Sequence, residues 1–134
     1  MTEPTAKYQE SEVQLVLVDD ESMVLDTLRS FLEFETDYNI AAFTDPQEAI
    51  DHGRHHEIDL VVSDFLMPGI NGIELLGAYA ESNPHAPRVL LTGYADKASA
   101  IKAINEVGLF QYLEKPWDND QMLVVFRNAL DRRF

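Results

Sequence analysis

Four sets of polar residues stand at the C-terminal ends of four short apolar runs, and their chemistry is complementary. Asp19-Asp20-Glu21 is an acidic cluster, Asp64 is a lone carboxylate, Thr92 supplies a hydroxyl and Lys115 supplies an ammonium group. Clustered carboxylates suit Mg²⁺, which prefers oxygen ligands. Together the four sets suit Mg²⁺-assisted transfer of a phosphoryl group to a carboxylate, because that reaction depends mainly on positioning and charge neutralisation.

The apolar runs that precede these residues predict how they are brought together. A short, wholly apolar run is typical of a parallel strand that is buried on both faces. The carboxyl ends of neighbouring parallel strands meet at one edge of the sheet, where open α/β sheets bind their ligands. We therefore expect one reaction centre at the ends of four strands. These strands are predicted at Val13–Val18, Leu60–Val62, Val89–Leu91 and Leu109–Leu113.

Helix signals alternate with these runs along the chain. A fifth, less apolar strand is predicted at Asn39–Phe43, near an edge of the sheet. Five successive βα units predict an α/β fold with helices on both faces of a mostly parallel sheet. Helices are expected over Ser22–Glu35, from a cap at Asp45-Pro46 with Gly53 following the helix, from Asn71-Gly72 to before Asn83-Pro84, from Asp96 to a stop at Gly108, and from a cap at Asp118.

Composition limits the possible functions. The 134 residues make one domain, with residues 1–11 as a polar N-terminal tail and residues 12–134 as the folded domain. The net charge of -14 argues against direct binding to nucleic acid and suits cations or basic partners. There is no cysteine, which fits a reducing cytoplasm. No apolar run approaches the roughly 20 residues of a membrane span.

The ordered motifs resemble those of a response-regulator receiver domain of two-component signal transduction, in the CheY-like superfamily. The resemblance covers residues 12–133. It implies a (βα)5 flavodoxin-like, doubly wound fold with strand order 2-1-3-4-5, which places Asp20 beside Asp64. The matching motifs are Val16-Leu17-Val18-Asp19-Asp20-Glu21, Asp64-Phe65-Leu66-Met67-Pro68-Gly69 with Asn71-Gly72, Leu91-Thr92-Gly93 and Tyr112-Leu113-Glu114-Lys115-Pro116.

The resemblance also implies a role for each site residue. Asp64 would accept a phosphoryl group from a sensor histidine kinase or a phosphotransfer protein, in a signalling module that turns over no external substrate. Lys115 and Thr92 would each contact a phosphoryl oxygen, and Gly93 would leave room for the group. The Mg²⁺ ligands implied are Asp19, Asp20, Asp64 and the backbone carbonyl of Leu66.

An output mechanism follows from the same resemblance. Thr92 and Tyr112 would form the switch that repacks the face made by the fourth helix, the fifth strand and the fifth helix. That face would form a homodimer or contact an output domain beyond Phe134.

The resemblance also bears on the lifetime of the phosphoryl group, because Leu66 and Tyr94 would flank the path of the hydrolytic water. Neither side chain carries a carboxylate or an amide to orient water, so we expect slow loss of the phosphoryl group.

Other interpretations stay open. Asp19-Asp20-Glu21 could be the acidic start of a helix, and Asp64 could cap a turn. The whole chain could be a receiver-like interaction module without phosphorylation, or a Mg²⁺-dependent phosphohydrolase with an aspartate nucleophile. Trp117 is expected to be a partly buried anchor. Solvated surface histidines explain a set that is spaced like helical metal ligands, namely His52, His55 and His56.

Overall fold

A parallel β-sheet lies at the centre of the computed structural model, which describes residues 8–93, 96, 98–99, 101–102, 105, 108–109 and 111–134. The sheet has five strands in the order β2-β1-β3-β4-β5, and every neighbouring pair is parallel. This topology confirms the predicted flavodoxin-like fold. The strands are β1 (Gln14–Val18), β2 (Asn39–Phe43), β3 (Leu60–Asp64), β4 (Arg88–Thr92) and β5 (Gln111–Glu114).

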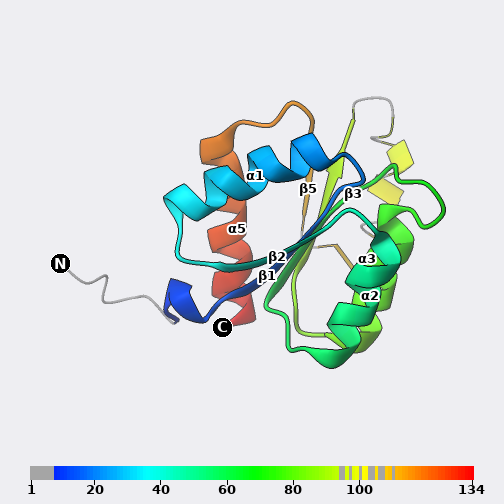
Figure 1. Ribbon diagram of the computed structural model, residues 1–134. Coiled ribbons are helices and arrows are strands. Elements are labelled where there is room, and N and C mark those ends of the chain that lie inside the picture. The colour runs from blue at the N-terminus through cyan, green and yellow to red at the C-terminus, as the bar shows by residue number, and fades with distance from the viewer. Residues whose placement is uncertain are drawn as a thin grey trace.

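Helices cover both faces of the sheet. Figure 1 places α1 (Ser22–Glu35) and α5 (Asn119–Arg133) on one face, and α2 (Pro46–His55) and α3 (Gly72–Ser82) on the other. A short 3-10 helix, η1, spans Glu10–Glu12. The helix expected from Asp96 lies largely outside the described residues. Helical backbone is described there at Ala98, Ser99, Ile101, Lys102 and Asn105.

Successive side chains of β1 divide between two apolar cores. Leu15 and Leu17 pack with the apolar faces of α1 and α5, whereas Val16 and Val18 pack with those of α2 and α3. This alternation follows from the two-residue period of a strand. Because both faces are covered, β1 is apolar almost throughout, which is the pattern that the sequence predicts.

The predicted helix caps are present. The Asp45 side chain accepts a hydrogen bond from the backbone N–H of Gln47 at 2.9 Å and begins α2. The Asp118 side chain does the same for α5, at 2.8 Å from the N–H of Asp120. Asn71 and Glu74 form a capping box at the start of α3, with hydrogen bonds of 2.9 and 3.1 Å. Each cap satisfies backbone donors that the first turn of a helix leaves unpaired.

Gly53 departs from the prediction because it lies inside α2 rather than after it. A Cβ atom at this position would come within 2.6 Å of the ring atom Cε2 of Tyr79 on α3. The Tyr79 hydroxyl in turn donates a hydrogen bond of 2.5 Å to the carbonyl of Ala49. The glycine therefore allows α2 to pack closely on α3, which is a tertiary requirement and not a helix stop.

The N-terminal segment packs against the end of α5. The rings of Tyr8 and Phe134 stack with centroids 5.0 Å apart. A side-chain oxygen of Glu10 accepts a hydrogen bond of 3.2 Å from the backbone N–H of Asp37. Residues 8–11 thus contact the domain although they fall within the predicted polar tail. The division at residue 12 stays a proposal.

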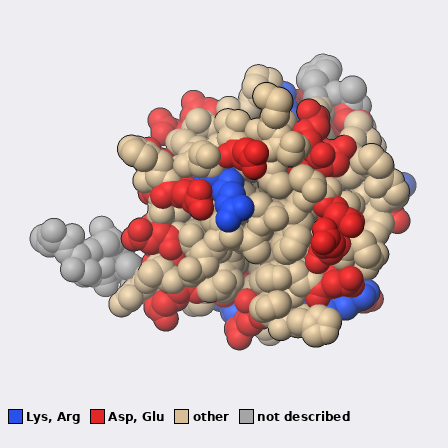
Figure 2. Space-filling view, viewed as in Figure 1, with Lys and Arg blue, Asp and Glu red and all other residues tan. Residues whose placement is uncertain are grey.

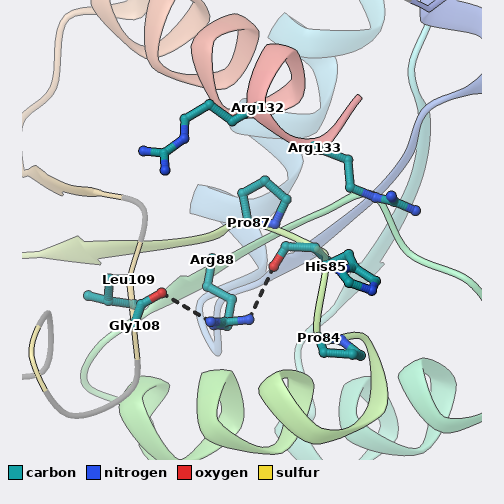
Figure 3. A pocket seen from close by; sticks show the side chains of 9 residues that line it. Pro84, His85, Pro87, Arg88, Gly108, Leu109, Arg132 and Arg133 are labelled. Carbon is teal, nitrogen blue, oxygen red and sulfur yellow. Dashed lines mark hydrogen bonds between the residues drawn. The ribbon is translucent and has the colours of Figure 1, made fainter.

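Figure 2 shows Asp and Glu side chains spread across the visible face of the molecule, with few Lys and Arg among them. A depression of about 260 Å³ carries Arg88, Arg132 and Arg133 (Figure 3). There the Arg88 guanidinium donates to the carbonyls of Ala86 at 3.3 Å and Gly108 at 3.1 Å, so it ties two loops together.

Among the described helices, none is long and apolar enough to cross a membrane.

Candidate functional site

The strand register aligns the predicted site residues at one edge of the sheet. Val18 pairs with Ser63, Asp64 pairs with Leu91, and Thr92 pairs with Glu114. Each strand therefore ends beside its neighbour, and the polar residues at these ends lie at the same edge. Their meeting is a consequence of parallel pairing in the order β1-β3-β4-β5.

An ion pair joins site residues that lie far apart in the sequence. The Lys115 ammonium nitrogen lies 2.6 Å from Oδ1 of Asp64 and 3.9 Å from Oδ2 of Asp19. The Lys115 backbone N–H donates a hydrogen bond of 2.8 Å to the Thr92 carbonyl, which fixes where β5 ends relative to β4. The peptide bond that follows, between Lys115 and Pro116, is cis. Asp64 is buried, so this ammonium group compensates its charge.

Two further carboxylates lie beside that ion pair. One oxygen each from Asp19, Asp20 and Asp64 lie within 4.8 Å of one another. Oδ1 of Asp19 accepts a hydrogen bond of 2.9 Å from the backbone N–H of Glu21, whereas Oδ2 is buried and has no hydrogen-bond donor. Buried anionic oxygens normally have a partner. This oxygen, which lacks a hydrogen bond, and its neighbouring carboxylates therefore fit a bound divalent cation.

One carboxyl group of this cluster, that of Asp19, has a raised pKa. Burial, with a smaller contribution from the charge of Asp64, raises the pKa of the Asp19 carboxyl from 3.8 to about 6. The hydrogen bond from the Glu21 backbone and the charge of Lys115 oppose the rise. Carboxylates that lie this close together repel one another when no cation is bound, which raises the pKa of at least one of them. Asp19 is that residue, because it is 1% exposed.

Mg²⁺ affinity should fall as the pH drops through about 6, because a cation binds the ionised form of Asp19. Below this pKa one proton competes with the cation, so the apparent dissociation constant should rise by about tenfold per pH unit. Above it the affinity should become independent of pH. Calorimetric Mg²⁺ titrations from about pH 5 to about pH 8 measure this dependence.

Asp19→Asn is the matched variant for this prediction. The raised pKa means that the folded state binds protons more readily than the unfolded state between 3.8 and about 6. The metal-free fold therefore loses stability as the pH rises through that window. Above it, Asp19→Asn should raise the Tm of the metal-free protein while it weakens Mg²⁺ binding. Glu21→Ala should bind Mg²⁺ like the wild type, and equal losses in both variants would contradict the assigned cluster.

Thr92 and Tyr112 occupy neighbouring strands. Thr92 is fully buried at the end of β4, and its hydroxyl donates to the Gly93 carbonyl over 3.3 Å. That distance is long for a hydroxyl hydrogen bond, so the group can turn toward another acceptor at small cost. Tyr112 is partly buried and packs against the core beneath α2 and α3. Both positions suit the predicted switch, which stays a prediction.

Gly72 is a site residue that the functional assignment from sequence missed. A Cβ atom here would collide with the backbone carbonyl oxygen of Asp64 and come within 2.9 Å of Cδ1 of Leu90. The Gly72 N–H also donates a hydrogen bond of 2.8 Å to the carbonyl of Phe65. The start of α3 is therefore packed directly against the end of β3. The signal in the sequence is a glycine at the first position of a helix, where it brings no capping advantage.

The remaining predicted residues lie at the margin of the site or outside the described part. The Leu66 side chain is 61% exposed, two residues after Asp64. Tyr94 lies outside the described residues, so its predicted position beside the site is untested. Trp117 is partly buried against the core under α1 and α5, as expected of an anchor. It lines an apolar depression of about 290 Å³ with residues of α1 that include Met23 and Phe31.

The fold and the site together define a class of protein. An open parallel sheet carries a buried aspartate, a lysine partner and an acidic cluster at the carboxyl edge of its strands, which is the arrangement of an aspartate-based signalling domain. The family model of the response regulator receiver domain matches residues 15–127. The chain therefore belongs to the response regulator receiver domain family, whose members are signalling modules of two-component systems.

Relatives of known sequence support this assignment. The phosphoglycerate transport system transcriptional regulatory protein PgtA of Salmonella typhimurium is 33% identical over 122 residues, which cover 91% of this chain and 29% of the relative. The transcriptional regulatory protein FixJ of Bradyrhizobium diazoefficiens is 30% identical over 116 residues, covering 87% of this chain and 56% of the relative. The chain spans between 25% and 53% of the length of the first curated relatives it matches.

Solved structures agree with the fold. The signal receiver domain of an HD domain-containing protein from Pseudomonas fluorescens has a TM-score of 0.83 and is 33% identical, covering 90% of this chain and 96% of that one. A receiver domain protein from Clostridium thermocellum gives the same TM-score at 28% identity, covering 90% and 96%. The likeness extends over nearly the whole chain, so the resemblance stated from sequence motifs is confirmed.

Proposed function

We propose that Asp64 of this receiver domain accepts a phosphoryl group from a phosphohistidine on a sensor histidine kinase or phosphotransfer protein. The contact of 2.6 Å between Lys115 and Asp64, inside a group of three carboxylates, is the observation that carries the proposal. The positively charged ammonium group of Lys115 thus lies against the single buried carboxylate of β3. A capping aspartate at a turn would need no such partner.

The step transfers the phosphoryl group from the donor imidazole to the carboxylate of Asp64. An oxygen of Asp64 attacks phosphorus, a P–O bond forms and the P–N bond to the donor imidazole breaks. The imidazole leaves with the bonding electron pair and takes up a proton, and Asp64 becomes a carboxyl phosphate anhydride. Lys115 then moves from the carboxylate oxygen to a phosphoryl oxygen, and the Thr92 hydroxyl donates to another. The protein contributes position and charge rather than covalent chemistry of its own.

Mg²⁺ is the cation that this acidic cluster fits best. Bound there, it would offset the negative charge of the carboxylates and of the incoming phosphoryl group. Carboxylate and carbonyl oxygens are its preferred ligands. The proposed ligands are the carboxylates of Asp19, Asp20 and Asp64 together with the backbone carbonyl of Leu66.

Output is proposed to pass through the face of the fourth helix, β5 and α5. Thr92 moving toward the phosphoryl group vacates space that Tyr112 can fill, which biases two arrangements of that face. The face would then form a homodimer or contact an output domain after Phe134. Several relatives are named as transcriptional regulators and are much longer than this chain. A module without DNA contacts of its own is consistent with the net charge of -14, and a cytoplasmic location is proposed from the lack of cysteine.

Stoichiometry separates this function from its two rivals. We expect treatment with acetyl phosphate and Mg²⁺ to add one phosphoryl group per chain, without sustained turnover of the donor. Continued hydrolysis of a small phosphate ester would favour the phosphohydrolase interpretation. Absence of both phosphoryl uptake and Mg²⁺ binding would favour an interaction module without chemistry. Intact-mass spectrometry measures phosphoryl uptake and phosphate release measures hydrolysis on the same sample. A separate titration measures Mg²⁺ binding.

Loss of the phosphoryl group should be slow, and Leu66→Asn should accelerate it severalfold. Hydrolysis of the anhydride needs an oriented water, and the exposed leucine two residues after Asp64 has no group that could hold one. An amide at this position would supply a donor and an acceptor. Decay of the phosphorylated protein after donor removal gives the rate. Leu66→Met is the control, and equal decay of Leu66→Asn and Leu66→Met would contradict the account.

A further inference from the structure

Ser63 carries a buried hydroxyl directly before the reacting aspartate. It is 0% exposed and lies two residues after Val61, on the face of β3 that packs with α2 and α3. Its hydroxyl donates a hydrogen bond of 2.9 Å to the backbone carbonyl of Asp64. Burying a hydroxyl is unfavourable unless it has a hydrogen-bond partner. This bond therefore accounts for a polar side chain on a face that otherwise packs apolar ones.

The peptide group between Asp64 and Phe65 is hydrogen bonded through both of its polar atoms. Its carbonyl accepts from the Ser63 hydroxyl, and its N–H donates to the carbonyl of Leu91 on β4 over 2.9 Å. The last pair between β1 and β3 joins Val18 to Ser63, so Asp64 lies just beyond it. The two bonds restrict rotation of the backbone at Asp64, at the point where pairing with β1 has ended.

Gly72 at the start of α3 leaves the space that the Asp64 carbonyl needs. A Cβ atom at this glycine would collide with the carbonyl oxygen. The Gly72 N–H donates a hydrogen bond of 2.8 Å to the carbonyl of Phe65 and so holds α3 close to the end of β3. The Asp64 carbonyl thus lies against the Ser63 hydroxyl and the backbone of α3, which limits it to a narrow range of orientations.

We propose that Ser63 is a positioning residue for phosphoryl transfer, which holds the Asp64 carbonyl so that the carboxylate faces Lys115 and the acidic cluster. The inference rests on the proposed function of Asp64. The direction in which the Asp64 side chain leaves the backbone decides whether its carboxylate reaches the Lys115 nitrogen, 2.6 Å away. The same direction places an Asp64 oxygen within 4.8 Å of ligand oxygens of Asp19 and Asp20. Ser63 itself touches none of the reacting atoms and acts only through this backbone.

The test measures phosphoryl uptake in saturating Mg²⁺ over a range of acetyl phosphate concentrations. Ser63→Ala should lower the maximal rate by about tenfold, because small displacements of a reacting group have large effects on rate. The donor concentration that gives half the maximal rate should stay unchanged. Ser63→Cys keeps the size of the side chain but offers only a weak donor, so its maximal rate should also fall.

Val61→Ala is the matched control for a general loss of stability. Val61 is fully buried on the same face of β3, and its truncation removes core packing at a distance from the Asp64 carbonyl. This variant should be less stable than the wild type in chemical denaturation, yet it should keep the wild-type maximal rate. An equal loss of rate in Val61→Ala would overturn the inference.

Carbon NMR reports the hydrogen bond itself. Accepting a hydrogen bond moves a carbonyl carbon signal downfield, so the Asp64 carbonyl signal should move upfield in Ser63→Ala and Ser63→Cys and stay in place in Val61→Ala. If Ser63→Ala fails to fold, Ser63→Cys decides the matter. Wild-type maximal rates in the folded Ser63 variants would overturn the inference and leave the proposed function standing. A wild type that takes up no phosphoryl group would overturn both.

Discussion

Asp64→Asn should abolish phosphoryl uptake from acetyl phosphate in the presence of Mg²⁺. The amide keeps the size of the carboxylate but lacks its negative charge and its nucleophilic oxygen. The variant should still fold, because the Lys115 ammonium group that loses the Asp64 carboxylate remains 3.9 Å from the Asp19 carboxylate. Intact-mass spectra should show one added phosphoryl group on the wild type and none on the variant.

Asp45→Asn is the control for that experiment. Asp45 caps α2 through a hydrogen bond of 2.9 Å to the Gln47 backbone, and asparagine caps a helix about as well as aspartate. Phosphoryl uptake by this variant should match that of the wild type. The comparison shows whether the reaction needs the Asp64 carboxylate in particular or is impaired by the loss of any aspartate. Equal modification of Asp64→Asn and wild type would mean that another residue is the acceptor.

Gly72→Ala should combine lower stability with slower phosphorylation. The added methyl group would collide with the Asp64 carbonyl oxygen and crowd Leu90, where it would come within 2.9 Å of Cδ1. Overpacking of this kind typically costs about 1–3 kcal/mol. Relief of the collision must shift the start of α3 or the end of β3, and a shift of β3 moves Asp64 away from Lys115. Chemical denaturation gives the stability, and the rate of phosphoryl uptake reports the geometry of the site.

Gly77→Ala provides the comparison within the same helix. Gly77 is partly exposed in the middle of α3, where alanine favours the helix over glycine. This variant should be at least as stable as the wild type and should take up phosphoryl groups at the wild-type rate. A Gly72→Ala protein with wild-type stability and wild-type uptake would show that α3 does not constrain the reacting carboxylate.

Local signals in the sequence predicted most of the secondary structure. Asp45, Asn71 and Asp118 each cap the helix expected of them, because a cap acts through backbone groups two or three residues away. The apolar runs predicted the strands, because a strand covered on both faces has no polar side to display. The site residue types followed from the same pattern, since each stands at the end of such a run. The strand order and the residue roles came from the resemblance of the motifs to a family.

Other properties depended on contacts between distant parts of the chain. Lys115 lies 51 residues from Asp64 along the sequence, yet their contact of 2.6 Å makes the site. The raised pKa of Asp19 arises from burial and from Asp64 on a neighbouring strand. Gly53 looks like a helix stop when only its neighbours in sequence are considered, but the Tyr79 ring on α3 explains why it lies within α2.

The sequence by itself thus determined which chemical groups the protein carries and which strand each one follows. Tertiary structure decided which carboxylate Lys115 contacts, which carboxyl titrates near pH 6 and why no side chain fits at Gly72. Caps and hydrophobic periodicity act over a few residues and are therefore readable in order along the chain. Distances between carboxylates, burial and close backbone approach are set only when strands and helices from separate segments pack together.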